Sequence, residues 1–330
     1  MNSTVKIRDA IRNYCFSNSR WLKIVGKGLL SLCSFLIINH FFGYISFLRN
    51  PIFAIIIAIA CAFIPLSAGG LLVMLYIFVQ LTGLSGQVAF IALALMVISY
   101  GLSLFYGAKH MYNISYLPVA LQVQMPYPIP VCSALLGEMN EVAAVISGGI
   151  LSFYLKTIRE NASVFIDEGS DVTVIDVISQ KMLANPMLYI FIASLVAMFV
   201  VIMLLKNTQM KRSYLVATVS GIFVEMAFML TGYVITGNLG KVPMLILANV
   251  VAFIVGFAIT YIFRDLDYER VERVQFEDDD YVYYVTAIPK IELSKEEKRV
   301  TRITTNTRSK FYNSGKIESD SKTEDVDESK

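Results

Sequence analysis

The sequence predicts an all-α, polytopic helical membrane bundle that contains broken or re-entrant helical hairpins, a short cytoplasmic strand-like segment and a disordered C-terminal tail. Three observations support this fold class. Of the 330 residues, 56% are hydrophobic and 16% are charged, against about 25% charged in an average soluble domain. Several windows exceed the roughly 18 apolar residues of a spanning helix. Prolines and a glycine pair interrupt two of these apolar stretches, so neither stretch forms one plain helix.

The N-terminal segment, residues 1–28, is basic. Six Lys and Arg residues stand against one acid, and Trp21 supplies an aromatic anchor, which is typical of an interfacial segment at the inner leaflet. A signal peptide is the alternative interpretation. The apolar run that follows is longer than a usual signal-peptide core and ends without a small-x-small cleavage pattern, so we expect a spanning helix over 27–48.

Residues 52–82 are too long and too apolar for one comfortable crossing. As a single helix the stretch would measure about 46 Å, against a hydrocarbon core of roughly 30 Å. Pro65 and the pair Gly69 and Gly70 divide it into two short pieces. The pattern predicts a helical hairpin, which is either re-entrant or made of two short spans, and residues 87–107 then form an ordinary span.

Residues 116–136 are the second interrupted stretch and contain four prolines. Pro126, Pro128 and Pro130 each remove a backbone donor and push the preceding residue out of the helical region. Unpaired backbone groups cost several kcal/mol in lipid, so the break needs shelter from protein or from a water-lined cavity. A hairpin here would also place both basic ends of the chain on the cytoplasmic side. One kinked span over 52–82 would restore the same parity.

Four further spans complete the predicted transmembrane domain, which covers residues 29–264. Their expected bounds are 139–156, 187–205, 213–235 and 243–264. The intervening loop 157–186 is acidic and is expected to be extracellular. In this scheme the two hairpins open toward opposite faces, a pattern by which inverted-repeat transporters build a midplane site.

Glu225 is the strongest single candidate for chemistry because it lies near the middle of a predicted span. A charged carboxylate at the bilayer centre costs at least a few kcal/mol. We therefore expect the side chain to face inward and to be protonated, paired or beside water. Such a group could carry a proton or hold a cation. A neutral glutamic acid that is bonded to a neighbouring helix is the structural alternative.

Other polar residues flank the proline-rich break. Gln122 and Gln124 precede it at a spacing of two, which cannot be one helical face, so at least one of them should meet protein or a cavity. Glu138, Asn140 and Glu141 follow it and could coordinate a cation or an ammonium group. The alternative for these three is helix capping, because they lie at the start of the next span. We predict that these residues and Glu225 line a substrate or ion route.

Familiar catalytic and metal-binding patterns are absent from the sequence. The two histidines lie in different segments, the four cysteines are scattered without a C-x-x-C pair, and the formal net charge is only +2. Zinc and haem sites therefore have almost no ligands to draw on, and no hydrolase, metalloprotease or Walker motif is found. The sequence predicts no enzyme, no cofactor, no metal site and no nucleic-acid partner.

The composition changes abruptly after residue 264. Residues 265–292 are predicted to be a juxtamembrane cytoplasmic segment whose first part continues the last span as a helix. Within it, YVYYVTAI is a β-branched and aromatic run that favours a short strand. Residues 293–330 are polar and are expected to be disordered. The run VQFEDDDYVYYVTAIPKI resembles a juxtamembrane signature of multi-spanning membrane proteins of clostridial bacteria, and this resemblance implies a bacterial plasma membrane but no particular substrate.

The leading functional hypothesis is a permease-like membrane protein that moves a small solute or ion, or the membrane subunit of a transporter. Costly polar groups and broken helices together within lipid support it. The alternative is a membrane scaffold or assembly factor that recruits a cytoplasmic protein partner through residues 265–330. In either case we expect a multi-pass protein of the bacterial plasma membrane, in contact with the bilayer, with both termini cytoplasmic.

Overall fold

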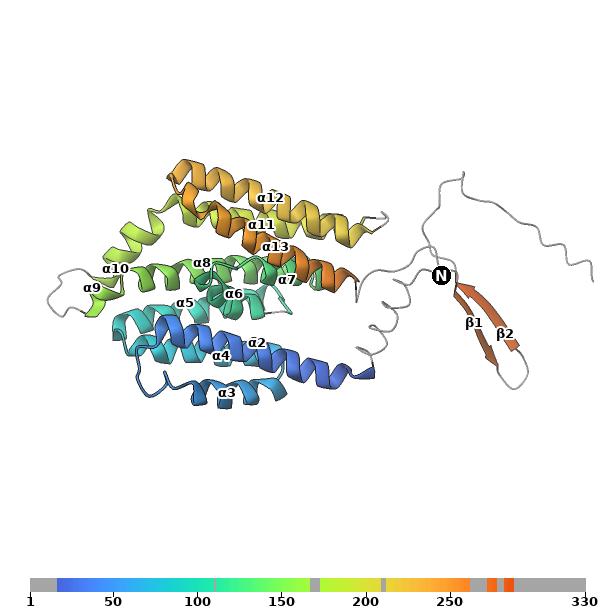
Figure 1. Ribbon diagram of the computed structural model, residues 1–330, viewed down its shortest axis with the longest axis horizontal. Helices are drawn as coiled ribbons and strands as arrows, with labels where there is room; N and C mark the ends of the chain where they lie inside the picture. The colour runs from blue at the N-terminus through green and yellow to red at the C-terminus, as the bar shows by residue number, and fades with distance from the viewer. Residues whose placement is uncertain are drawn as a thin grey trace, which may run out of the picture. The chain divides into compact units, whose positions relative to one another are not determined.

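The computed structural model describes residues 17–109, 111–166, 173–208, 212–261, 272–277 and 282–287. The chain falls into two compact units, Met1–Glu269 and Arg270–Lys330. In the first unit the described residues form a bundle of helices (Figure 1), which confirms the predicted helical fold. In the second unit they form two β-strands.

The bundle contains ten helices of nine or more residues in its described part. They are α2 (Ser19–Phe42), α3 (Pro51–Phe63), α4 (Leu66–Thr82), α5 (Gly86–Phe105), α6 (Tyr112–Gln122), α7 (Pro128–Leu136), α8 (Val142–Glu160), α11 (Pro186–Lys206), α12 (Ser213–Thr236) and α13 (Val242–Ile259). The short turns between them are η1 (Met139–Glu141), α9 (Ala162–Ile166), α10 (Val174–Val177), the π-helical η2 (Ile178–Leu183) and η3 (Leu239–Lys241).

Six helical segments in the described ranges are long and apolar enough to cross a membrane. They are Arg20–Phe42, Gly86–Phe105, Met139–Glu160, Pro186–Lys206, Ser213–Thr236 and Leu239–Ile259. Their length and composition are compatible with a multi-pass integral membrane protein. The helices α3, α4, α6 and α7 are shorter, with 17 residues or fewer, and they form two helical hairpins.

The first span is displaced relative to the predicted range 27–48. Helix α2 begins at Ser19 and ends at Phe42, so residues 19–28 of the predicted basic segment are helical, while residues 1–16 lie outside the described residues. Long basic side chains permit this, because their apolar stems can lie along the helix while the charge reaches water. The helix ends early because the chain must turn back before Pro51, which opens α3 after the N-cap residue Asn50.

Helices α3 and α4 form the first hairpin, and its two ends lie at the same end of α2. At the tip, the Lys27 ammonium donates to the carbonyl of Ile64, at 2.7 Å. At the base, the Tyr76 hydroxyl and the Gln80 amide of α4 both donate to Asn39, near the end of α2. The hairpin therefore begins beside the end of α2, reaches back toward its start and returns.

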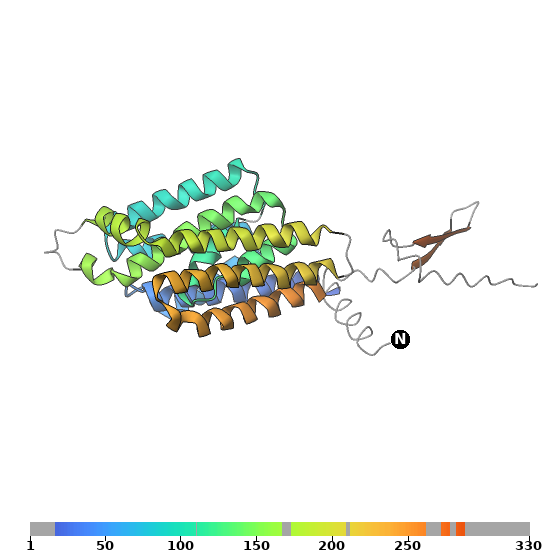
Figure 2. The ribbon, with the colours of Figure 1, turned by 90° about the horizontal axis from the view of Figure 1, so that it is seen from above.

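Helices α6 and α7 form the second hairpin, which begins earlier than the predicted residue 116. Asn113 at its start donates to Ser133 near its end, with 2.7 Å between Nδ2 and Oγ. The chain reverses over residues 123–127, and α7 then begins at Pro128. This hairpin contacts α4 and α8 on one side and α11 and α13 on the other, so it occupies the middle of the bundle (Figures 1 and 2).

The two hairpins open toward opposite ends of the bundle. We call these the η1 end, where Met139–Glu141 lies, and the α10 end, where Val174–Val177 lies. The first hairpin is followed by α5, which begins at the α10 end, since the Tyr154 hydroxyl in the second half of α8 donates to Val88, at 2.7 Å. Helix α5 runs to the η1 end, and the second hairpin both begins and ends there.

The second unit contains an antiparallel pair of strands, β1 (Glu272–Glu277) and β2 (Val282–Ala287). The register pairs Glu272 with Ala287 and Glu277 with Val282. Strand β2 lies within the run predicted to be a strand. Strand β1 shows that the predicted helical continuation of the last span does not include residues 272–277, while residues 262–271 lie outside the described residues. The alternation of β-branched, aromatic and polar residues in ERVQFE fits a strand partner better than a helix. The predicted disordered tail, 293–330, lies outside the described residues.

Candidate functional site

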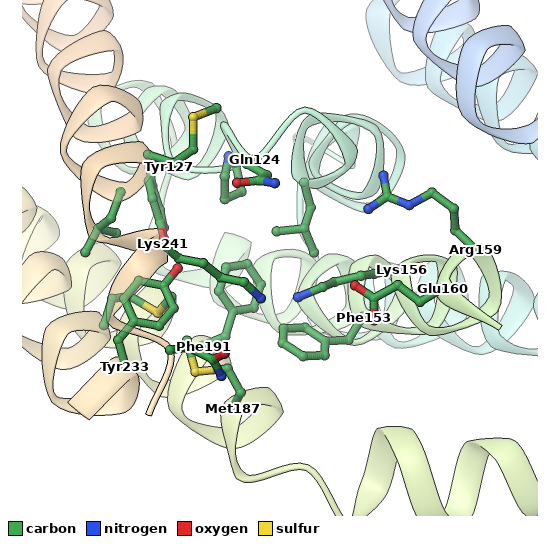
Figure 3. A pocket seen from close by; sticks show the side chains of 16 residues that line it. Gln124, Tyr127, Phe153, Lys156, Arg159, Glu160, Met187, Phe191, Tyr233 and Lys241 are labelled. Carbon is green, nitrogen blue, oxygen red and sulfur yellow. The ribbon is translucent and has the colours of Figure 1, made fainter. Parts of the chain in front are cut away.

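A cavity of about 220 Å³ at the α10 end of the bundle is the strongest candidate site. Gln124, Pro126 and Tyr127, from the tip of the second hairpin, form one of its walls. The end of α8, the start of α11, the end of α12 and the η3–α13 corner complete it (Figure 3). We call it the tip cavity. It brings together five parts of the chain that are far apart in the sequence.

The charged side chains of the tip cavity are mostly basic. Lys156 and Arg159 come from the last turns of α8, Lys241 comes from η3, and Glu160 is the one carboxylate among the described residues that line it. Lys156 and Lys241 point toward one another (Figure 3). Arg159 donates to the backbone carbonyl of Gln122, at 3.2 Å. Of the three cations, only Arg159 therefore has a hydrogen-bond partner in the described structure.

Much of the rest of the cavity wall is aromatic or aliphatic. Phe153 of α8 and Phe191 of α11 are 4% and 1% exposed, and their ring centroids lie 5.4 Å apart. Lys156 lies with its ammonium 5.1 Å from the Phe153 ring centroid. A neighbouring cavity of about 470 Å³ shares Phe153, Lys156 and Glu160 and reaches Lys181 of η2. The tip cavity therefore continues toward the short helices at this end.

Glu225 lies beneath the tip cavity and is fully buried, with 0% of its surface exposed. It shares one face of α12 with Met229 and Tyr233, which line the cavity. The side chains of Tyr127 and Asn249 adjoin the carboxyl group. Neither carboxyl oxygen has a hydrogen-bond partner of good geometry among the described residues. A negative charge here would be removed from water and would have the neutral side chains of Tyr127 and Asn249 beside it, which favours a proton or a cation at this carboxyl group.

Gln122 and Gln124 lie together at the hairpin tip, but they differ in exposure. Gln122 is 3% exposed, and its amide donates to the carbonyl of Pro118, at 3.3 Å. Gln124 lines the tip cavity. Its backbone has φ of 60°, a left-handed conformation that costs a non-glycine residue about 1–2 kcal/mol. The strained residue of the hairpin is therefore at the cavity wall.

Glu138, Asn140 and Glu141 lie at the η1 end, and the structure does not bring them together with Gln122 and Gln124. The Lys109 ammonium binds Glu138 at 2.5 Å, and the Lys109 backbone N–H donates to Glu141 at 2.9 Å. The hydrogen bond from the Lys109 ammonium to Glu138, together with the charge of that carboxylate, raises the pKa of Lys109 above its ordinary value.

The capping alternative for these acids is not seen as side-chain hydrogen bonds at the start of either helix. Neither η1 nor α8 has a side-chain hydrogen bond at its N-cap. Lys109 binds both acids instead, because the loop before α6 lies beside η1. A local capping rule could not foresee this partner, which comes from another segment. Glu138 and Glu141 follow α7 and Lys109 precedes α6, so these contacts link the two ends of the second hairpin.

Sequence reasoning did not single out Lys156, Arg159, Lys241 or Tyr127. A usable signal was present for the first two, which lie three residues apart, on one helical face, in the last turns of a span. Lys241 gave no such signal because it enters the site from a short turn. In the described ranges, no group of three or more His, Cys, Asp or Glu side chains gathers in a metal-binding arrangement.

No protein-family model, curated protein or solved structure matches this chain. Its function is therefore inferred from its own residues.

Proposed function

We propose that this protein is a multi-pass membrane permease that moves a small solute or ion through the tip cavity. One observation carries the proposal. A broken hairpin from the η1 end reaches the tip cavity at the α10 end, directly above a fully buried carboxyl group, Glu225, that has no well-aligned hydrogen-bond partner among the described residues.

The free-energy cost of these features in a membrane explains why they support a transport function. A broken helix within lipid is stable only where protein or a cavity shelters its backbone. An intramembrane carboxyl group without compensation lowers stability, so its presence favours a functional role. Glu225 would carry the coupling proton or hold a cation, and Tyr127 and Gln124 would border the route on the hairpin side.

We further propose that the membrane is a bacterial plasma membrane and that the η1 end is cytoplasmic. Six crossings and two hairpins return the chain to the side on which it began. The basic residues Arg20, Lys23, Lys206 and Arg212 lie at the η1 ends of their helices, as the positive-inside rule requires. Both termini would then be cytoplasmic, and the acidic loop 157–186 would be extracellular.

Flux in reconstituted vesicles tests the role of Glu225. Purified wild-type protein and the Glu225→Gln and Glu225→Ala variants are compared for proton and cation flux under an imposed gradient. We expect both variants to lose roughly tenfold or more of the flux, as is typical when a proton-transferring group is removed. Asp176→Asn, which changes an exposed carboxylate outside the tip cavity, is the matched control and should keep wild-type flux. Unchanged flux in both Glu225 variants would remove this residue from the mechanism.

A scaffold function is the second candidate, and the β1–β2 pair favours it. An isolated two-stranded hairpin is marginally stable in water, so it is expected to pair with a further strand or surface. Deletion of residues 270–330 separates the two functions. Unchanged flux after deletion supports the permease. Absence of flux from the full chain, with a cytoplasmic protein that cross-links only when residues 270–330 are present, supports the scaffold.

A further inference from the structure

We propose that the tip cavity binds a small organic anion, in which a carboxylate or phosphate group is attached to an apolar body. The inference rests on the permease function proposed above and names the substrate class of that same cavity.

The charge balance of the cavity calls for an anion. Three cationic side chains and one carboxylate line it in the described structure. Lys156 lies close enough to Lys241 and Arg159 to be repelled by both, and close enough to Glu160 to be attracted. Even so, neither Lys156 nor Lys241 forms an ion pair with any residue in the described ranges. An oxyanion between the two ammonium groups would relieve this repulsion and accept hydrogen bonds from both.

The surroundings strengthen this interaction and add specificity. Lys156 is half-buried and lies against the buried ring of Phe153, so its charge is less screened than at an open surface. Phe191 and Met229, both nearly fully buried, supply an apolar surface. A few polar groups that converge on an apolar pocket are typical of a small-molecule site.

The size of the cavity limits the ligand. Its volume of about 220 Å³ is below the roughly 300–1,000 Å³ of pockets for drug-sized molecules. A single aromatic or aliphatic acid fits this range better than a whole phospholipid. A lipid headgroup carries the same anionic chemistry, however, and the experiment includes an arm that separates the two sources.

Equilibrium dialysis of the full chain, purified in a neutral detergent, tests the inference with radiolabelled benzoate as the probe. Benzamide, which has nearly the same shape without the charge, is the matched ligand control. We expect benzoate to bind and to be displaced by excess unlabelled benzoate or phenyl phosphate but not by benzamide. Equal displacement by benzamide, or no binding of benzoate, would overturn the inference. Displacement by dihexanoyl phosphatidylglycerol but not by phenyl phosphate would overturn the assignment to a soluble anion.

Charge variants locate the binding to the cavity. Lys156→Gln and Lys241→Gln should each weaken benzoate binding roughly tenfold or more, the loss expected for one charge-assisted hydrogen bond. Lys156→Arg, which keeps the charge, should stay within about threefold of wild type. Lys23→Gln, at the opposite end of the bundle, is the protein control. An equal loss in Lys23→Gln, or no loss in either cavity variant, would contradict the assignment. A loss in Lys156→Arg as large as in Lys156→Gln, with a lower thermal midpoint, would also contradict it, because misfolding would then explain the loss.

Transport measurements separate this inference from the function on which it rests. Benzoate binding that depends on Lys156 and Lys241, in a protein without proton, cation or benzoate flux, supports the anion site and overturns the permease. Flux that is unchanged in both lysine variants, in a protein that does not bind benzoate, supports the permease and overturns the anion site.

Discussion

Both helical hairpins of this bundle are apolar stretches that proline interrupts, yet one is partly exposed and the other is mostly buried. In α3 and α4 one face is buried and the other is largely exposed, as at Phe63 with 72% of its surface accessible. In α6 and α7 most side chains are buried, as at Leu117 with 0%. One hairpin lies at the edge of the bundle, and the other lies in its middle.

Side-chain size and polarity account for the difference. The buried stripe of α3 consists of small residues, Ala54, Ala58, Cys61 and Ala62, and its other face is Ile-rich, which suits a helix between protein and lipid. The second hairpin carries Asn113 and Ser133, which bond to each other. Polar pairs of this kind favour burial against protein. An interruption in an apolar stretch therefore predicts a hairpin, and the polarity of its faces predicts where that hairpin packs.

The largest expected effect tests how closely each hairpin packs on its neighbour. A Cβ added at Gly148 of α8 would lie 2.6 Å from the carbonyl oxygen of Asn113 in α6. Since backbone must move, we expect Gly148→Ala to lower the free energy of unfolding by about 2–3 kcal/mol. The matched change, Gly28→Ala, places its Cβ 3.2 Å from the Cβ of Ala62 in α3 and should cost less than about 1 kcal/mol.

Denaturant titration in detergent micelles, followed by circular dichroism, measures both glycine variants. Equal losses would mean that the central hairpin packs no more tightly than the peripheral one, and the contrast between them would fail.

The next effect concerns the lysines that bind each hairpin to a neighbouring helix. The Lys206 ammonium of α11 donates to the carbonyls of Ala134 and Gly137, both at 2.7 Å, whereas Lys27 donates to Ile64 alone. Hydrogen bonds from charged groups contribute about 1.5–3 kcal/mol. We expect Lys206→Met to cost about 2–3 kcal/mol and Lys27→Met about half as much, measured in the same titration. A larger loss for Lys27→Met would reverse the ranking of the two hairpins.

The smallest effect concerns the hairpin tips. Gln124 has φ of 60°, while Pro65 at the tip of the first hairpin has φ of −54°. Gln124→Gly should therefore raise the free energy of unfolding by about 1 kcal/mol. Val123→Gly, where φ is −89°, is the matched control and should lower it by about 0.5–1 kcal/mol. Stabilisation by both glycines would show that flexibility, and not relief of a left-handed residue, is responsible.

The sequence predicted those parts of the structure that depend on local physics. The long apolar runs predicted the helical bundle, and Pro65, Pro126 and Pro128 lie where its helices break, because a missing donor and a fixed φ act at the residue itself. The prediction for Pro130 is wrong, since it lies in the first turn of α7 and the residue before it is helical. The buried Glu225 was predicted for a similar reason, since one acid in an apolar run has few ways to be accommodated.

The tip cavity could not be predicted because it depends on contacts between distant segments. Lys156 and Lys241 belong to different helical elements, and only packing brings their charges together. Glu138 and Glu141 resembled helix caps, yet Lys109 from another loop binds both. In each case the role of a charged side chain depends on a partner from a distant segment, and residue spacing within one segment cannot predict that partner.

The way in which the second hairpin is held implies how it can move. Its base is fastened by two bonds from Lys206, by the Asn113–Ser133 pair and by Lys109. At its far end, Arg159 donates to the carbonyl of Gln122 at 3.2 Å, and the buried side chain of Tyr127 adjoins the carboxyl group of Glu225. A hairpin that is fastened by more hydrogen bonds at its base than at its tip moves more easily at the tip. We expect displacement of residues 123–127 to admit or release solute while the surrounding helices stay in place.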